Sequence, residues 1–266
     1  IIDDKIDILY DINPIEPKYV NIINIFGNTR TLDKVVRREL GFSEGDPLNP
    51  DLITSATIDI QRLNIFKNIE IKENFINDEK SNIDIYLEEK PTGDFSVGAS
   101  FQSLDGAVFV ANLNENNIGG TGRSVSFNIN TSDTNTLYSF DVKEPYFNNN
   151  NVHLIYGLKY INNDYSQTSS YNLNSFNSNI GVEYQLIDNL YHNISLAYEL
   201  DDYEITDSSA VSSSILSSEG TNSVIKINNI LQYNKLNSFL RPTKGYFIRL
   251  SSILSPITNS SDGYIK

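Results

Sequence analysis

The sequence contains no cysteine, no tryptophan and no methionine in its 266 residues. Without cysteine, the chain has no disulfide framework and no thiolate metal site. No run of about 18 apolar residues occurs, which excludes a transmembrane helix. No signal peptide is visible. Because methionine is absent, the first residue is not an initiator, and we expect a processed chain or a piece of a longer one.

Basic residues are also scarce. The chain has 20 Lys and Arg against 34 Asp and Glu, which gives a net charge of −14. This balance argues against a nucleic-acid partner, since phosphate contacts need clustered positive charge. The mean hydropathy of −0.31 is usual for a soluble protein. It is equally expected of a transmembrane β-barrel, because alternation along each strand hides the apolar face from any average.

Residues 18–90 mix helical and strand periods. The stretch "KYVNIINIFGN" is typical of a strand with Val20, Ile22 and Ile25 facing inward, closed by a Gly27-Asn28 turn. In "TLDKVVRREL" the apolar residues fall at helical spacing, with Thr31 placed to cap the helix and Gly41 just past its end.

A second helix should begin at "NPDL", where Asn49 is a good N-cap and Pro50 suits the first helical position. Two strands, Phe66–Asn74 and Ser81–Glu89, follow, joined by the polar turn "NDEK". The expected order, β-α-α-β-β, makes a compact α+β module.

The first residues resemble the end of this module. "KIDILYDINP" matches "NIDIYLEEKP" in its Ile-Asp-Ile and its final proline, and the two lie one module length apart. We therefore interpret residues 1–17 as the end of a preceding repeat in a tandem array.

From Pro91 to Lys266 the pattern changes to segments of about ten residues that alternate apolar and polar side chains. Counting these segments predicts about nine antiparallel strands. The turns "NNIGGTG" and "NNNN" are short, whereas residues 201–222 form a long, serine-rich loop. Short turns at one end and long loops at the other are typical of outer-membrane barrels. A soluble β-sandwich alternates in the same way, so alternation alone leaves both folds open.

Several stretches together resemble a known family. "VNIINIFGNTRTLDKVVRREL", "EGDPLN", "LNIFKNIEI" and "LEEKPTG" look like the last POTRA domain of the BamA-type outer-membrane assembly family. "NENNIGGTGRS", "FDVKEPYF" and "RPTKGYFIRL" resemble the opening strands and turns of its barrel. The resemblance implies a POTRA domain at 18–90, the last of its array, and at 91–266 the N-terminal part of a β-barrel, about nine of roughly 16 strands.

The resemblance also implies a function and a location. We expect a central component of the machinery that folds and inserts outer-membrane β-barrel proteins, with its POTRA domains in the periplasm. Its partners would be unfolded outer-membrane clients, assembly-complex lipoproteins, periplasmic chaperones and the lipid bilayer. The alternative is a POTRA-barrel transporter of the two-partner secretion or translocation-module type. A passive porin and a soluble ligand-binding protein fit the sequence less well.

The first barrel strand is the candidate gate, the place where a client strand would pair. Its residues Gly93, Phe95, Val97, Gly98, Ala99 and Phe101 combine two glycines with an outward apolar face. Glycines weaken a strand, so we expect its pairing to be exchangeable. Pro91 and Thr92 would form a hinge between module and barrel. In the POTRA domain, Arg37 and Arg38 are candidate docking residues, although a solvated helix face explains them as well. The strand Phe66–Asn74 could also offer its edge to clients.

No pattern indicates an enzyme or a cofactor. His153 and His192 lie in separate strands without metal-ligand spacing. The pairs Glu88-Glu89 and Asp201-Asp202 are expected to be solvated strand ends. "NIGGTGR" lies between two strands and opens no helix, which favours a tight hairpin turn over a phosphate-binding loop.

Overall fold

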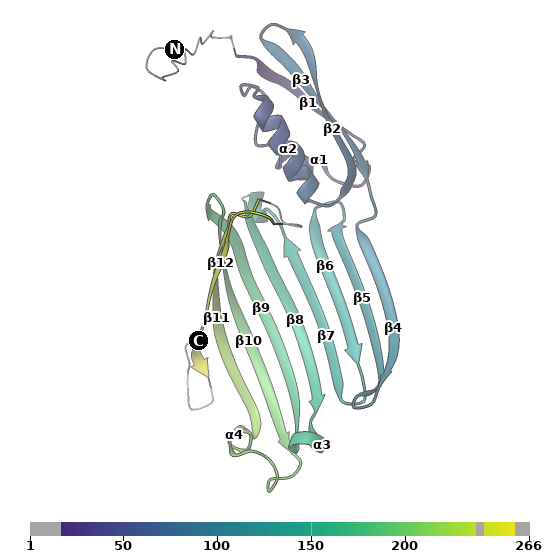
Figure 1. Ribbon diagram of the computed structural model, residues 1–266, viewed down its shortest axis with the longest axis vertical. Coiled ribbons are helices and arrows are strands. Elements are labelled where there is room, and N and C mark those ends of the chain that lie inside the picture. Colours follow the sequence, from purple (N-terminus) through teal and green to yellow (C-terminus); the bar gives the residue numbers. More distant parts are fainter. Residues whose placement is uncertain (1–16, 150, 238–241, 259–266) are drawn as a thin grey trace, which may run out of the picture. The chain divides into compact units, whose positions relative to one another are not determined.

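The computed structural model describes residues 17–149, 151–237 and 242–258. The chain divides after Lys90 into two compact units, a smaller N-terminal one and a larger one of strands (Figure 1). The proposed end of a preceding repeat lies almost wholly outside the described residues. Within the described ranges, no helix combines the length and apolar character needed to cross a bilayer.

The N-terminal unit has the order β-α-α-β-β predicted from the sequence. It consists of β1 (Tyr19–Phe26), α1 (Asp33–Arg37), α2 (Pro50–Arg62), β2 (Phe66–Asn77) and β3 (Lys80–Glu89). The sheet order is β1-β3-β2, in which β1 runs parallel to β3 and β2 antiparallel to it. The two helices and one face of this sheet form a core, in which most side chains are less than 3% exposed. Its members include Val20, Ile23, Val35, Val36, Leu40, Ala56, Ile60, Ile65, Ile83 and Ile85.

Two details of this unit differ from the prediction. Ile22 is 47% exposed and Ile23 is buried, because the register of β1 on β3 shifts between Val20 and Ile23. One extra residue in a strand moves every later side chain to the other face. Helix α1 is also shorter than expected and begins after Leu32, without a side-chain cap, so Thr31 is not the N-cap.

Helix α2 begins as the sequence predicts. The side chain of Asn49 accepts a hydrogen bond of 2.9 Å from the backbone nitrogen of Asp51, and Pro50 occupies the first turn. Ala56 and Ile60, one turn apart, face the core and are fully buried. The helix ends at Arg62, and Asn64 then takes a left-handed conformation (φ 57°), so that the chain can turn into β2.

The larger unit is a single antiparallel sheet of nine strands, ordered β4 to β12 as in the sequence (Figure 1). This number agrees with the count made from alternation. The strands are β4 (Gly93–Gln102), β5 (Gly106–Ile118), β6 (Arg123–Thr131), β7 (Asn135–Glu144), β8 (Val152–Asp164), β9 (Tyr171–Ile187), β10 (Leu190–Ile205), β11 (Gly220–Asn234) and β12 (Phe247–Thr258). In the described parts of the connections, short helical turns occur at Phe147–Asn149, Ser166–Ser169 and Ser213–Leu216.

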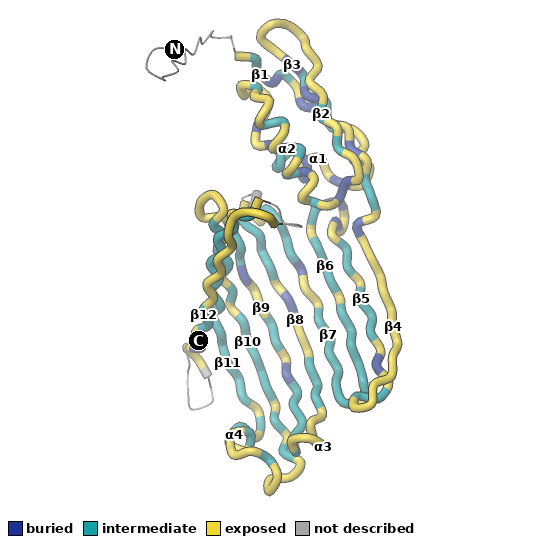
Figure 2. The backbone as a smooth tube through the Cα atoms, in the orientation of Figure 1, coloured by how far each residue is buried: buried dark blue, intermediate teal, exposed yellow. Residues whose placement is uncertain are grey.

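The register of the ladders places apolar side chains on one face of this sheet. One row that crosses β4 to β8 consists of Phe95, Leu113, Phe127, Phe140 and Leu158, each opposite the next. The adjacent row on the other face consists of Ser96, Asn112, Asn128, Ser139 and Lys159. Little of this unit is buried: among its described apolar residues only Val108 and Val142 belong to the buried class (Figure 2).

The connections do not divide strictly into short turns at one end and long loops at the other. At the end where β4 begins, the connections are 119–122, 145–151, 188–189 and 235–246. At the opposite end they are 103–105, 132–134, 165–170 and 206–219. The predicted long loop is shorter than expected, because β10 continues to Ile205 and β11 begins at Gly220. The "NIGGTGR" stretch is the expected tight turn between β5 and β6.

Candidate functional site

Strand β4 forms one edge of the nine-stranded sheet. All ten of its residues pair in continuous register with β5, and among the described residues no strand lies on its other side. In an antiparallel ladder, alternate residues direct their N–H and C=O groups to opposite sides. About half of the residues of β4 therefore present unpaired backbone groups along this edge. Such an edge can accept another strand.

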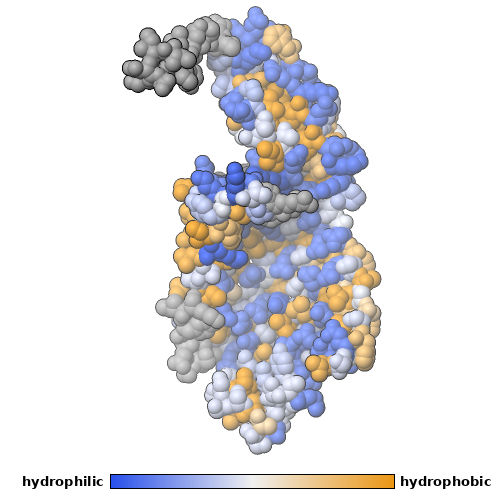
Figure 3. Space-filling model, in the orientation of Figure 1, coloured by the Kyte–Doolittle hydropathy of each residue, from blue (hydrophilic) through white to orange (hydrophobic). Residues whose placement is uncertain are grey.

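The side chains of the candidate gate strand fall on the predicted faces. Phe95, Val97, Ala99 and Phe101 share the apolar face with their partners on β5. Three of them are highly exposed, at 68% for Phe95, 69% for Val97 and 81% for Phe101. In Figure 3, apolar side chains gather along this edge of the sheet. The edge therefore combines open hydrogen-bonding groups with an uncovered apolar face.

The two glycines of β4 have different surroundings. A Cβ atom on Gly93 would lie 2.8 Å from a carboxylate oxygen of Glu115, so this position has little room for a side chain. A Cβ atom on Gly98 would meet nothing within 4 Å. Gly93 therefore lies close to the side chain of Glu115, whereas Gly98 faces open space. The ladder between β4 and β5 is continuous through both glycines, and exchangeable pairing of β4 stays a prediction.

Thr92 is firmly attached to the sheet. It is only 8% exposed, and its hydroxyl donates a hydrogen bond of 2.5 Å to Glu115. Its carbonyl oxygen accepts from both the backbone and the side-chain nitrogen of Asn116, at 3.2 Å each. The carboxylate of Glu115 also accepts a hydrogen bond of 2.7 Å from the backbone nitrogen of Asn117. The side-chain oxygen of Asn117 in turn accepts one from the backbone nitrogen of Gly122. Hydrogen bonds with the end of β5 and the following turn thus hold the start of β4.

Lys90, two residues earlier, is attached to the N-terminal unit in a similar way. Its backbone nitrogen donates a hydrogen bond of 3.0 Å to the backbone oxygen of Ile65. Its backbone oxygen accepts one of 2.8 Å from the guanidinium of Arg30. Pro91 is exposed and is the one residue between these two sets of bonds. Of the two residues predicted to form a hinge, Thr92 is thus hydrogen-bonded to Glu115 and Asn116 of β5, and Pro91 lies between the two sets of bonds.

Glu89 was expected to be a solvated strand end, and the structure shows otherwise. Its side chain is 6% exposed. Its carboxylate accepts hydrogen bonds from the backbone nitrogens of Thr31 (2.7 Å) and Arg30 (3.1 Å) and from the hydroxyl of Thr29 (2.8 Å). Burial alone would raise the pKa of Glu89, but the bonds from Thr31, Thr29 and Arg30 outweigh it and lower the pKa to about 2. The "NTRT" loop therefore folds around an ionised carboxylate at the end of β3.

Within the described residues, the edge of the N-terminal sheet that no other segment covers is β2. Strands β1 and β2 are the two edges, but the outer edge of β1 is covered by the segment 45–48. The backbone of Val20 donates to Asp46 at 2.9 Å and accepts from Gly45 at 2.7 Å, and Leu48 bonds to Lys18. Near the tip of the hairpin that β2 forms with β3, Phe75 is 60% exposed. Strand β2, which the sequence suggested could offer an edge to clients, is thus the sheet edge without a paired neighbour among the described residues.

The two candidate docking arginines lie in different environments. Arg37 is half-exposed, and its guanidinium bonds Glu44 at 2.8 Å and the backbone oxygen of Ile23 at 2.8 Å. The bond from Arg37 lowers the pKa of Glu44 from its usual value. The side chain of Arg38 is only 15% exposed and pairs with Glu39 at 3.3 Å. Arg37 alone presents much of its charge at the surface.

The two histidines do not come together. His153 lies 3.3 Å from Glu183 on the polar face, where Lys143 bonds the same carboxylate at 3.0 Å. His192 bonds Tyr184 and Asn229 on the apolar face. In the described ranges, no group of three or more His, Cys, Asp and Glu side chains has a geometry suited to a metal ion.

Family models match most of the chain. Residues 18–90 match the POTRA family described as the surface antigen variable number repeat, and residues 117–266 match the Omp85 superfamily domain. Outer membrane protein assembly factor BamA from Neorickettsia risticii is 26% identical over 93% of this chain and 34% of its own length. The same factor from Neisseria meningitidis serogroup B is 30% identical over 58% of this chain and 19% of its own.

Solved structures share the fold. BamA from Haemophilus ducreyi lacking POTRA domains 1–3 superposes with a TM-score of 0.71 at 21% identity, covering 91% of this chain and 49% of that one. CdiB from Acinetobacter baumannii has a TM-score of 0.58 at 14% identity, covering 90% of this chain and 48% of that one. The chain spans about a third or less of the length of the two BamA relatives. It belongs to the Omp85 superfamily, with the POTRA-then-barrel arrangement of BamA-type proteins.

Proposed function

We propose that the protein folds other β-barrel proteins and inserts them into the bacterial outer membrane. The observation that carries this proposal is the position of β4, which is fully paired with β5, is the edge strand of the described sheet and has a highly exposed apolar face. A client strand that pairs with β4 satisfies its own backbone groups as it enters the lipid. Each unsatisfied group would otherwise cost several kcal/mol in hydrocarbon.

The POTRA module supplies a second edge in this mechanism. The outer edge of β2 has no paired neighbour among the described residues and the strand is mostly exposed, so an unfolded client can add a strand to the sheet through backbone bonds. Main-chain pairing depends little on sequence, which suits a machine that handles many clients. Module and barrel wall are joined through Pro91, so motion of the module reaches the start of β4 through one residue. The reaction requires no bond chemistry and no cofactor.

Other partners follow from the same proposal. The POTRA module would lie in the periplasm, where it receives clients from periplasmic chaperones. Arg37 and Glu44 form an exposed, charged feature on the module that assembly-complex lipoproteins could contact. Arg38 contributes little to such a surface because it is mostly buried.

The alternative is a POTRA-barrel transporter of the two-partner secretion or translocation-module type, which would pass a dedicated substrate outward. The similarity to CdiB concerns the fold alone and does not separate the two functions. Reconstitution of the full-length protein in liposomes does. We expect faster folding of an unrelated, urea-unfolded barrel protein, followed by its heat-modifiable mobility on gels. A transporter of a dedicated substrate would leave that rate at the level of empty liposomes.

A cross-linking experiment tests the role of β4 itself. Because the chain has no cysteine, Ser100→Cys adds a single thiol on β4 to this part of the protein. During assembly, we expect it to form disulfides with cysteines in the first or last strand of a client. The matched control is Ser126→Cys, on the same face but on β6, which has neighbours on both sides. Equal cross-linking at both positions would contradict pairing at the β4 edge.

A further inference from the structure

Four polar side chains form a hydrogen-bonded chain on the apolar face of strands β9 to β12. The hydroxyl of Tyr184 lies 2.7 Å from Nδ1 of His192, and Nε2 of His192 lies 2.5 Å from the amide oxygen of Asn229. The amide nitrogen of Asn229 donates to the hydroxyl of Ser252 at 3.4 Å. The ladder register places these residues on the face that carries Val182, Ile194, Leu231 and Leu250.

The bonding pattern defines which groups can bind a ligand. An amide oxygen only accepts, so Nε2 of His192 donates to the amide oxygen of Asn229. The amide nitrogen of Asn229 has a second hydrogen besides the one directed at Ser252, and the hydroxyl of Ser252 can still donate. Asn229 on β11 and Ser252 on β12 therefore each have a hydrogen left to donate, which suits a ligand with oxygen acceptors. Polar groups on a lipid-facing surface are costly and indicate a functional site.

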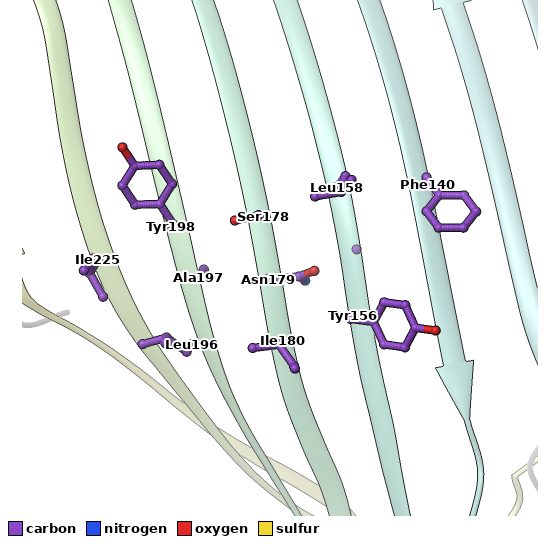
Figure 4. Close-up of a pocket in the computed structure, with 11 residues that line it drawn as sticks. Phe140, Tyr156, Leu158, Ser178, Asn179, Ile180, Leu196, Ala197, Tyr198 and Ile225 are labelled. Atoms are coloured by element: carbon purple, nitrogen blue, oxygen red, sulfur yellow. The ribbon is translucent and has the colours of Figure 1, made fainter. Parts of the chain in front are cut away.

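An apolar groove lies on the same face, in the middle of strands β7 to β11 (Figure 4). Its volume is about 510 Å³. Ser178 creates it, because this small side chain sits between Leu158 and Tyr198 in a row of otherwise large residues. Phe140, Tyr156, Ile180 and Leu196 are among its other lining residues. Every strand of the groove has a neighbour on both sides, so the groove does not depend on the edges of the sheet.

The polar chain and the groove are arranged like the head and the tail of one amphiphile. On β9 and β10, Tyr184 and His192 lie four residues from the groove residues Ile180 and Leu196, which is about 13 Å along a strand. His192 is also close to the connection 188–189, at the end of the sheet where β4 begins. A lipid headgroup at the surface of the bilayer would meet the polar chain, and its acyl chain would extend into the groove.

We propose that this face holds one phospholipid molecule, distinct from the surrounding bulk lipid. Its phosphodiester or ester oxygens accept hydrogen bonds from Asn229 and Ser252, and one acyl chain fills the groove over Ser178. The site lies on the wall of the barrel away from β4. Its role is therefore separate from strand exchange, and it does not rest on the insertase function.

The test uses the full-length protein in phosphatidylethanolamine vesicles that contain a small fraction of the same lipid with a photoreactive diazirine in its acyl chain. After irradiation, labelled peptides are identified by mass spectrometry. We expect labelling of the groove peptides of β8 to β10 to exceed that of β5 by at least about fivefold, as a preference near 1 kcal/mol would give. Labelling that only follows exposed area would overturn the proposal.

Two kinds of variant separate head from tail. Ser178→Phe fills the groove and should reduce labelling there by about fivefold or more, whereas Ala111→Phe, on the same face of β5, should not. Asn229→Leu with Ser252→Ala removes both donors and should reduce labelling of an unaltered groove. Unchanged labelling in both kinds of variant, with heat-modifiable mobility showing a folded barrel, contradicts a specific lipid site. Loss of client folding without loss of labelling would affect the insertase function alone.

Discussion

The POTRA sheet and the barrel sheet are built from the same alternation of apolar and polar residues, yet they use it differently. In the POTRA unit the apolar faces of three strands and two helices close on one another, and Ile60, Ile83 and Ile85 are fully buried. In the nine-stranded sheet the corresponding residues remain exposed, as in Val97 at 69% and Leu158 at 50%. The alternation determines which side chains share one face of a sheet. It does not determine whether protein or another medium covers that face.

The stability of the two units should therefore respond differently to the loss of apolar side chains. Ile85→Ala removes a fully buried side chain from the POTRA core and should cost about 3–4 kcal/mol, because it leaves a cavity. Val97→Ala on β4 leaves no cavity and should cost less than about 1 kcal/mol. Hydrogen exchange of the POTRA amides in the full-length protein measures the first. A similar loss for both would show that β4 is buried against protein rather than lipid.

The next prediction tests whether the apolar face of the sheet meets lipid. Phe127→Arg places a charge in the middle of β6 on that face and should cost about 2–4 kcal/mol in a bilayer. Asn128→Arg, one residue further along, places the same charge on the polar face and should cost far less. Urea titration of the full-length protein in vesicles measures both. Equal effects of the two substitutions would contradict the assignment of the faces.

In the POTRA unit, acid should weaken the contact between the "NTRT" loop and β3. The pKa of Glu89 is about 2 in the folded protein and near 4.5 when unfolded. Because the folded pKa is the lower one, this stability is fully present above about pH 4.5 and is lost as the pH falls towards 2. The difference corresponds to about 3 kcal/mol.

Glu89→Gln separates this contribution from general acid effects. The variant should be less stable than the parent at pH 7, and the difference in stability should shrink below about pH 4.5 and nearly vanish only as the pH approaches 2. Hydrogen exchange of the POTRA amides, compared at several pH values, gives the measurement. Glu88→Gln is the matched control: Glu88 is exposed and bonds only Lys67 and Asn68 among the described contacts. A constant gap between Glu89→Gln and the parent across this range would refute the assigned pKa.

The sequence predicted the element order, the nine strands and the faces of β4, because these depend on local periodicity. The prediction of the inward-facing residues failed where one extra residue changes the register. The bulge in β1 turns Ile23 instead of Ile22 towards the core, and no sequence signal marks it. The sequence-based prediction also missed Glu89 and Glu115. Both carboxylates lie next to turns and look solvated in the sequence, but residues about 60 and 23 positions away hold them.

The hinge shows the same limitation. Thr92 lies directly after a proline at a change of composition, which indicates a flexible junction from the sequence alone. Its bonds to Glu115 and Asn116 depend on how β4 pairs with β5, and this pairing is a tertiary property. The turn "NENNIGGTG" was recognised as a hairpin, but its Glu115 was not recognised as the anchor of β4. The sequence therefore predicts which residues form the candidate gate strand, but not the hydrogen bonds that hold its start.

The smallest expected effect on stability concerns Arg37, and it separates structure from docking. Arg37 and Glu44 are both about 40% exposed, so breaking their pair with Arg37→Glu should cost less than about 1 kcal/mol. Combining it with Glu44→Arg restores opposite charges and should recover that loss. If a lipoprotein partner contacts Arg37, the double variant should regain stability and still bind the partner more weakly, as measured by co-purification of the full complex. Recovery of both properties would assign the pair to the fold of the POTRA unit, where Arg37 also bonds the oxygen of Ile23.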